Sequence, residues 1–532
     1  MIRKKPVEVW GEYQQSLQYD QAIGLFETVQ QNEDFYIGDQ WKGVNAPDMD
    51  KPVANILKRP VSYLVASIMS DDIGISLSRY SDAASDRALM QMLESQYKEL
   101  METAAVKKKL RQMLRDAVVD SDGCVHYFWD ADAQLHLQKE GVEQTPGVIK
   151  AEVLENTCVY FGNTESCEVE GQPWIIIRYR RGLEELREWA AERGIDPEEI
   201  QSDEEADATN AENEKDKVTV LRKYWMEKGQ LWLLEQTRSI TLTEPTNTGA
   251  HRYPIVWFPW ERVKNRYHGQ AVLTGMLPNQ IYRNKLIAMA NRHVYMMAFP
   301  KVVYNASLIG KWTNRVGEAV AANGDPNQAV AAGFRAPDMS AQVMELIRFL
   351  KDDTTEAVGA SDAALGNVKP DNTSAIIATQ KATAVPLELQ RMAFYDAVEE
   401  SCRIWLDMMA AYYGKRLVRM QEEVMDPVTG TVAEVTVEKV FDFADIKGMD
   451  LRLEVEVGAS SYWSELMQAT TLTNLYRERG MSLKVLLHNL PDGILANKQS
   501  ILDEIEKEER EAAMRQPAAK PGGVTDAAMP IV

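Results

Sequence analysis

The chain has 532 residues, a formal net charge of −21 and only four cysteines. This length and composition exclude a small disulfide-stapled scaffold, and the acidic balance argues against a nucleic-acid binder that relies on net basic charge. Any contact with DNA is therefore expected to be local. Because the cysteines lack CxxC spacing, a reducing compartment is expected. No window approaches the ~20 apolar residues of a membrane span, and the basic N-terminus lacks the apolar run of a signal peptide, so neither membrane insertion nor secretion is expected.

The first ~120 residues predict helices, because apolar residues recur there at three- and four-residue spacing. From Gly123 the pattern changes to CVHYFWD, CVYFG and PWIIIRYR, short β-branched and aromatic runs that predict strands of a mixed sheet. The stretch GLEELREWAAERG predicts a short helix. Residues 201–217 are so polar and acidic that a mobile surface loop is expected, and strands resume at KVTVLRKYW.

Two predicted helices bracket a small irregular segment. The first runs from Pro278 to Ala298 with proline in its first turn, and the second covers MSAQVMELIRFLKDDTTEAV. Between them, FPKVVYNAS is typical of a strand and begins a stretch rich in Gly and Pro. The pattern predicts a helical hairpin with a small domain at its tip.

The stretch GNVKPDNTSAIIATQKATAVPLE, from Gly366 to Glu388, places turn-forming residues before a run of small residues. A helix is predicted from Ser374 to about Tyr413, with Pro386 as its kink. In the simpler interpretation, Ser374 caps an ordinary core helix after a surface loop. Short strands are predicted at KVFDFADI and DLRLEVEVG, followed by helices and a disordered tail. The fold class expected is α+β, mainly helical.

The sequence lacks the common catalytic and metal-binding motifs. Gly310 and Lys311 are followed by Trp312, with no glycine placed to begin a phosphate loop, and HExxH and GxSxG patterns are missing. The sequence therefore predicts no enzyme, no catalytic residues, no metal and no cofactor. A local basic group lies on the first hairpin helix, and three roles are open for it: contact with nucleic acid, a solvated face, or inter-subunit ion pairs, the last two being favoured. Its members are Arg283, Lys285, Arg292 and His293.

Four passages, taken in order, resemble the portal proteins of tailed bacteriophages, the head-to-tail connectors of the capsid. The first is FYIGDQW followed by KPVANILKRPVSYLVASIMSD, and the second is DAVVDSDGCVHYFWD with VYFGNTESCEVEGQPWIIIRYR. The third is YHGQAVLTGMLPNQIYRNKLIAMANRHVYMMAFPKVVY, in which Gly269, Gln280 and Asn284 hold places often filled by the same residues in the family. The fourth is the loop before the predicted kinked helix. The resemblance covers about residues 20 to 510.

The resemblance implies a portal-type fold with wing, stem, clip and crown, assembled as a ring. It divides the chain into a wing at 1–277, a stem helix at 278–299, a clip at 300–338, a second stem helix at 339–358, a tunnel loop at 359–373, a long kinked helix with returning wing strands at 374–462, crown helices at 463–514 and a disordered tail at 515–532. The acidic loop at 201–217 and the short C-terminus depart from the family pattern.

The implied function is a channel through which double-stranded DNA is packaged and ejected, made by a ring of usually twelve copies. The implied partners are the terminase, the major capsid and scaffolding proteins and the head-completion adaptor, without a membrane. The implied location is the capsid vertex of the virion, reached from the host cytoplasm.

The resemblance also implies roles for particular residues. The tunnel loop would contact DNA, with Lys369 giving each subunit one positive charge toward the channel. Its candidate residues are Gly366, Asn367, Lys369, Asp371 and Asn372. The four basic residues of the first hairpin helix become candidates for channel or subunit contacts, and Pro386 for a hinge. In the clip, Trp312, Asn314 and Arg315 are candidates for terminase or adaptor contacts.

Two other functions stay open at this point. A metal-dependent DNA-processing enzyme would use acidic pairs such as Asp120 with Asp122, or Asp352 with Asp353, to bind Mg²⁺. Adjacent carboxylates on a helix point apart, which weakens the second pair. A capsid scaffold or adaptor without a channel is the third hypothesis, and the absence of a ring would favour it.

Overall fold

A computed structural model describes most of the chain in twelve longer segments. These are residues 6–47, 49–69, 72–78, 84–133, 144–203, 216–299, 301–313, 319–334, 338–359, 387–425, 432–447 and 452–458, with 472–474, 476–477 and 486 in addition. The chain divides into two compact units, residues 1–69 with 75–456 and residues 70–74 with 457–532. The second unit lies almost wholly outside the described residues, so the account below concerns the first.

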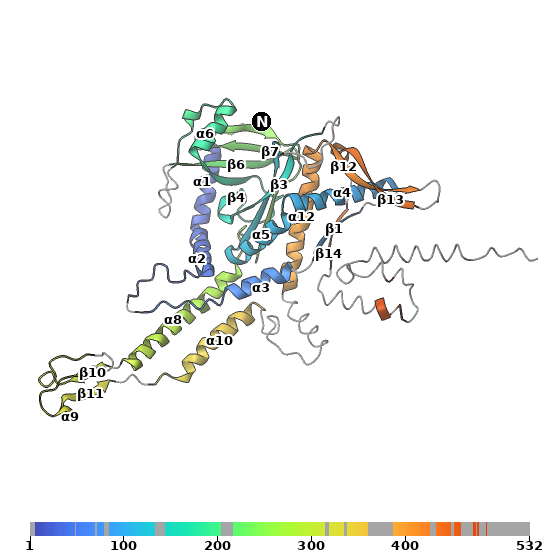
Figure 1. The fold of residues 1–532 in the computed structure, drawn as a ribbon. Coiled ribbons are helices and arrows are strands. Elements are labelled where there is room, and N and C mark those ends of the chain that lie inside the picture. The colour runs from blue at the N-terminus through green and yellow to red at the C-terminus, as the bar shows by residue number, and fades with distance from the viewer. Residues whose placement is uncertain are drawn as a thin grey trace, which may run out of the picture. The chain divides into compact units, whose positions relative to one another are not determined.

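The described residues contain both helices and strands (Figure 1). The helices are α1 (Pro6–Ala22), α2 (Leu25–Ile37), α3 (Lys58–Ile68), α4 (Ala84–Thr103), α5 (Val106–Asp120), α6 (Leu183–Glu192), α8 (Val272–Ala298), α9 (Pro326–Ala329), α10 (Ala341–Ala357) and α12 (Glu388–Tyr412). The strands are β1 (Asp72–Ser78), β2 (Asp122–Asp130), β3 (Val148–Leu154), β4 (Val159–Phe161), β5 (Ile175–Gly182), β6 (Lys217–Glu227), β7 (Gln230–Gln236), β8 (Thr241–Asn247), β9 (Ile255–Pro259), β10 (Lys301–Tyr304), β11 (Val330–Phe334), β12 (Lys415–Met425), β13 (Val432–Asp442) and β14 (Arg452–Gly458). The expected α+β class is confirmed, with more described residues in helices than in strands.

Two sheets form the centre of the first unit. One has five strands in the order β4-β5-β6-β7-β8 and the other has three in the order β3-β2-β9, with antiparallel pairing throughout. Side chains on both faces of β5 are buried, because successive residues of a strand point to opposite faces of the sheet. Ile175 and Ile177 point into a core shared by both sheets, whereas Ile176 packs on the opposite face with Val9 and Tyr13 of α1. The five-stranded sheet is therefore covered on both faces.

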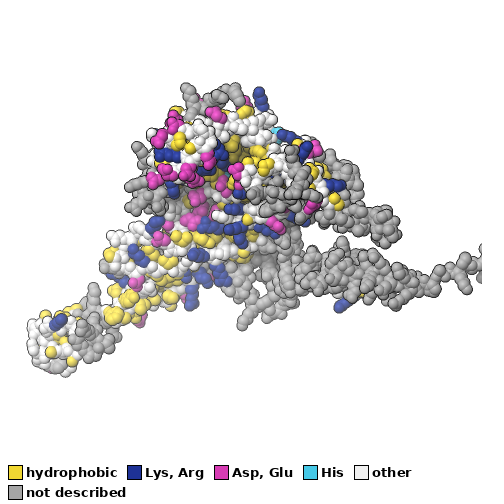
Figure 2. Space-filling model, turned by 45° about the horizontal axis from the view of Figure 1, so that its top comes forward, with side chains coloured by type: hydrophobic (Ala, Val, Ile, Leu, Met, Phe, Trp, Pro, Cys, Tyr) yellow, Lys and Arg dark blue, Asp and Glu magenta, His cyan; other side chains and the backbone are white. Residues whose placement is uncertain are grey.

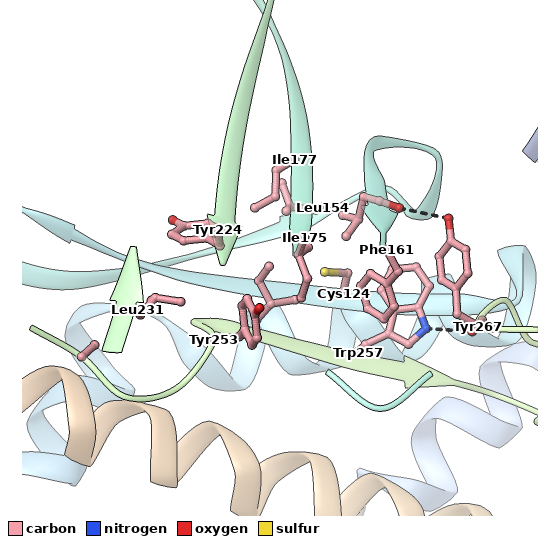
Figure 3. Packing of buried hydrophobic residues seen from close by; sticks show 13 residues of the cluster. Cys124, Leu154, Phe161, Ile175, Ile177, Tyr224, Leu231, Tyr253, Trp257 and Tyr267 are labelled. Atoms are coloured by element: carbon pink, nitrogen blue, oxygen red, sulfur yellow. Dashed lines mark hydrogen bonds between the residues drawn. The ribbon is translucent and has the colours of Figure 1, made fainter. Parts of the chain in front are cut away.

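Aromatic side chains fill the core between the sheets (Figure 3). The ring of Phe161 on β4 lies 5.1 Å from that of Trp257 on β9 and 4.8 Å from that of Tyr267. Trp257 Nε1 donates to the Tyr267 carbonyl at 3.1 Å, so the buried indole is satisfied. This packing fixes the segment that leads from β9 into α8.

Several sequence-based boundaries are wrong. Helix α8 begins at Val272 and places Pro278 inside the helix, because Leu273, Met276 and Leu277 bury an apolar face that continues the helix past the proline signal. Within the helical pattern of the first ~120 residues, α4 and α5 are separated at Ala105, which has a φ of 49°. Strands β1 and β12 were not predicted, whereas β2, β5, α6, β10 and α10 are confirmed.

Part of the prediction falls outside the described residues. The tunnel loop (except Gly359), the first part of the long helix with Pro386, and almost all of the predicted acidic loop and crown lie there. Helix α12 covers Glu388–Tyr412 of the helix that was predicted from Ser374 to about Tyr413.

Candidate functional site on the helical hairpin

Helices α8 and α10 form the predicted hairpin (Figure 1). They run antiparallel, because Asn279 near the start of α8 donates to Asp353 Oδ2 and Thr354 Oγ1, both at 3.1 Å, near the end of α10. Ile347, Leu350 and Thr354 are the buried side chains of α10 and recur at helical spacing. At the tip, β10 pairs antiparallel with β11.

A cluster of amide side chains fastens α8 to the body of the unit, and we call it the amide joint. It consists of Gln40, Asn55, Gln280 and Asn284. Asn284 Nδ2 donates to Gln40 Oε1 at 2.6 Å, and its Oδ1 accepts from Gln280 Nε2 at 2.9 Å. The Ile56 N–H donates to Gln280 Oε1 at 2.9 Å. Gln40, Gln280 and Asn284 are buried, so these amides satisfy one another in place of water.

The amide joint brings together the first and third of the passages that carry the family resemblance, the first of which contains both FYIGDQW and ANI. Asn55 Nδ2 donates to the carbonyls of Phe35 and Tyr36, and Gln40 Nε2 to the carbonyl of Phe35, which closes the turn after α2. Gln280 and Asn284 come from α8, about 230 residues later. The FYIGDQW passage, the ANI passage and α8 therefore meet in one polar core.

A second buried network holds the approach to α8. His268 lies between Asp122, whose Oδ2 is 2.9 Å from Nδ1, and Asp20, whose Oδ1 is 3.3 Å from Nε2. Burial disfavours the imidazolium, but the hydrogen bonds and charges of Asp122 and Asp20 outweigh it and raise the pKa of His268 to about 9. The Gly269 N–H donates to Asp122 Oδ1 at 2.7 Å. A Cβ on Gly269 would lie 2.8 Å from the Glu261 carbonyl oxygen, so glycine is required there.

Helix α8 carries a stripe of exposed side chains at alternating spacings of three and four residues. This α8 stripe comprises Tyr282, Lys285, Met289, Arg292, Met296 and Phe299. Met289 is 59% exposed and Phe299 is 63% exposed. Residues 294–299 are exposed on every side of the helix, and five of the six are large hydrophobics. Such a helix end is typical of a segment that is covered in an assembly.

Helix α10 has a matching row. This α10 stripe comprises Gln342, Leu346, Phe349, Asp353 and Glu356, again at spacings of four and three. Phe349 is 62% exposed although it lies between the buried Ile347 and Leu350. Figure 2 shows the hydrophobic side chains gathered along this hairpin. The hairpin therefore exposes several large apolar side chains interspersed with charges, a composition that suits a protein interface.

The predicted basic residues of α8 do not share one environment. Arg283 is half-buried beside the amide joint, where Nη1 donates to the Ala54 carbonyl at 2.7 Å and burial lowers its pKa. Lys285 and Arg292 are exposed in the α8 stripe, and His293 is partly buried with Nε2 facing no described partner. Their role as channel or subunit contacts stays a prediction.

Of the predicted clip contacts, Trp312 is described and Asn314 and Arg315 are not. The Trp312 ring stacks on that of Tyr304, at the end of β10, with centroids 5.6 Å apart and planes 25° apart. The tunnel-loop residues Gly366, Asn367, Lys369, Asp371 and Asn372 and the hinge Pro386 also lie outside the described residues.

The acidic pairs of the enzyme hypothesis are placed as follows. Both oxygens of Asp122 accept from protein groups, including Ser121 Oγ at 2.7 Å. Asp120 is buried, and burial together with Glu33 raises its pKa to about 8. Asp352 and Asp353 are exposed on α10. Among the described residues, no three His, Cys, Asp or Glu side chains are grouped as metal ligands.

Sequence reasoning missed a strong segregation of charge. Residues 51–70, 103–115 and 262–317 contain 17 Lys or Arg and no Asp or Glu, so the rest of the chain carries a formal charge of −38. At the chain's average, about 13 acidic residues would be expected in segments of this combined length. The segments supply α3, the first part of α5, and α8, which pack together. Figure 2 shows Lys and Arg gathered where the hairpin joins the body.

No family model matches the chain, and no curated protein matches it significantly. Within the part that the structure describes, no helix is both long and apolar enough to cross a bilayer.

Proposed function

We propose that this chain is a portal subunit, which assembles with further copies of itself into a ring around a channel for double-stranded DNA. The observation that carries the proposal is the α8–α10 hairpin, with its exposed apolar stripes and its buried amide joint. A single chain leaves Tyr282, Met289 and Phe349 half or more exposed, and a second copy would bury them. The resemblance of the same segments to portal stem helices supports this assignment.

The environment of the last turns of α8 supports contacts with two neighbours. A subunit of a closed ring touches a neighbour on each side, through two different surfaces. Residues 294–299 are exposed all round the helix, so a neighbour on one side alone would leave part of them in water. A ring, in which the hairpins stand side by side, covers such a segment better than a two-fold dimer does.

The charge distribution suits passage of DNA without tight binding. Each phosphate neutralised by Lys or Arg adds salt-dependent affinity, so a conduit needs few of these contacts. In the proposal, the ring of Lys369 side chains from the tunnel loops centres the duplex, and a separate terminase supplies ATP hydrolysis. The missing phosphate loop in this sequence is consistent with that division of labour.

Electron microscopy of the purified protein, with its mass from light scattering, tests the assembly. The expected result is closed rings with an opening that admits a duplex. A monodisperse monomer that cuts DNA when Mg²⁺ is added would overturn the proposal and favour the enzyme hypothesis. Assemblies without a hole would favour a scaffold or adaptor.

The channel role has its own test. Lys369→Glu is expected to change DNA packaging or retention while ring mass and appearance stay those of the wild type. Unchanged packaging in this variant would refute the role of Lys369 and leave the ring proposal intact.

A further inference from the structure

Helices α3 and α5 present a dense group of basic side chains outside the hairpin. We call it the α3–α5 basic surface, and its residues are Lys58, Arg59, Lys107, Lys108, Lys109 and Arg111. The two helices pack against each other, and five of the six side chains are exposed, Lys109 being half-buried. The surface lies within two of the three segments that contain no acidic residue.

The spacing on α5 aligns its cations. Lys108 and Arg111 lie three residues apart and are both exposed, whereas Leu110 and Leu114 of the same helix are buried. Arg115, one turn further, lies over the ring of Tyr36 at 5.0 Å, and Lys58 of α3 approaches the same ring at 5.9 Å. Tyr36 thus contacts one cation of each helix.

Arg115 itself is neutralised, because it pairs with Glu33 and with Asp116 Oδ1 at 3.0 Å. Lys108 and Arg111 form no ion pair with any residue that the structure describes. Their charges repel one another in the single chain and lie on a protein of net charge −21. An anionic partner would remove this repulsion.

The chemistry of the surface favours nucleic acid over an acidic protein. Protein interfaces bury apolar and aromatic side chains and are depleted in Lys, and no large hydrophobic side chain of α3 or α5 is prominently exposed among the described residues. Contacts with a phosphate backbone need only Lys, Arg and polar groups, and Gln112 completes the row. One turn of α5, about 5–6 Å, spans roughly two phosphates at 3.4 Å of rise along one strand.

We propose that the α3–α5 basic surface binds the phosphate backbone of double-stranded DNA without sequence preference. This contact is separate from the Lys369 ring and does not require a ring, so it stands or falls independently of the portal proposal.

The test measures fluorescence anisotropy of a labelled random-sequence duplex with the full-length protein, at a series of salt concentrations. The test variant is K108Q/R111Q. The control is K228Q/R238Q, which removes the same charge from two exposed turns next to β7. Removing two phosphate contacts is expected to weaken binding at least tenfold near 0.1 M salt and to make the slope of log K against log salt shallower by about 1.8. The control is expected to match the wild type.

Three results would overturn the proposal. They are no binding by the wild type even at low salt, equal binding by K108Q/R111Q and wild type, and an equal loss in the control. If K108Q/R111Q keeps its DNA affinity but changes the mass of the assembly, the surface is a contact between copies. Light scattering of the same samples reports ring assembly, so failure of the portal proposal is seen separately.

Discussion

Replacing Phe349 of the α10 stripe by alanine should weaken contacts between copies. Phe349 is 62% exposed in the single chain, so docking of a second copy would remove most of its exposed surface from water. A Phe side chain buries about 200 Å², which leaves roughly 120 Å² for the contact. At about 25 cal/mol per Å², that area contributes about 3 kcal/mol to each contact in the assembly.

This energy predicts a concentration shift that can be measured. A loss of about 2–3 kcal/mol weakens each contact about 30- to 150-fold. Sedimentation velocity over a dilution series should therefore show that the Phe349→Ala assembly dissociates at a concentration at least about 30-fold higher than the wild-type assembly does. Because the side chain is largely exposed in the single chain, the melting temperature of the dissociated subunit should change little.

Leu389→Ala is the matched control, because Leu389 on α12 is 75% exposed outside the hairpin. It should dissociate like the wild type. If Phe349→Ala and wild type dissociate at the same concentration, the α10 stripe is not an assembly surface. If both variants shift equally, exposure alone explains the effect and the hairpin has no special part.

Three further predictions concern the body of the unit. Asn284→Ala should lower the free energy of unfolding by about 2–3 kcal/mol in urea titrations, because it leaves buried amides of the joint unpaired; a loss below half a kcal/mol would contradict this. The pKa of His268 is raised in the folded protein above its unfolded value. Its contribution to the free energy of unfolding, about 3 kcal/mol, is therefore complete below pH 6.5 and lost as pH rises through about 9. The melting temperature of the wild type should fall over that interval and converge toward that of His268→Gln, whereas parallel curves would refute the assignment. Gly269→Ala should destabilise by about 1–3 kcal/mol through its clash with the Glu261 carbonyl, while Gly275→Ala, with nothing within 4 Å in α8, should stabilise by about 0.5–1 kcal/mol in the same assay; the opposite order would be inconsistent with the packing.

The sequence predicted an element well where its capping residue, its apolar period and its charged residues all indicate the same boundaries. Helix α10 has a serine cap, a regular apolar period and charged last turns, and it was predicted nearly to the residue. The start of α8 was missed because Pro278 is a strong start signal, and only the burial of Leu273 and Met276 in the folded protein overrides it. Strand β12 carries Met, Gln and Glu, which favour a helix, and its long pairing with β13 decides its conformation.

Some features of the candidate site could likewise be predicted from the sequence, whereas others depend on contacts between distant residues. The basic residues of α8 were visible in the sequence, but Arg283 and Lys285 are two residues apart and have different surroundings. The partners Gln40 and Asn284 are separated by 244 positions, and no local signal pairs them. The acid-free stretch 262–317, by contrast, is readable from the sequence alone and needed only a count of charges by segment.

The amide joint has a consequence for how the molecule responds to its ionic surroundings. Its members carry no formal charge, so neither added salt nor a change of pH near neutrality weakens the bonds between Gln40, Asn284 and Gln280. The lysines and arginines on α3 and α5 are screened under the same conditions. Concentrated salt would therefore release a bound polyanion while the hairpin stays attached to the body of the unit. A wash of rising ionic strength would thus weaken the contacts of the basic side chains and leave the amide joint intact.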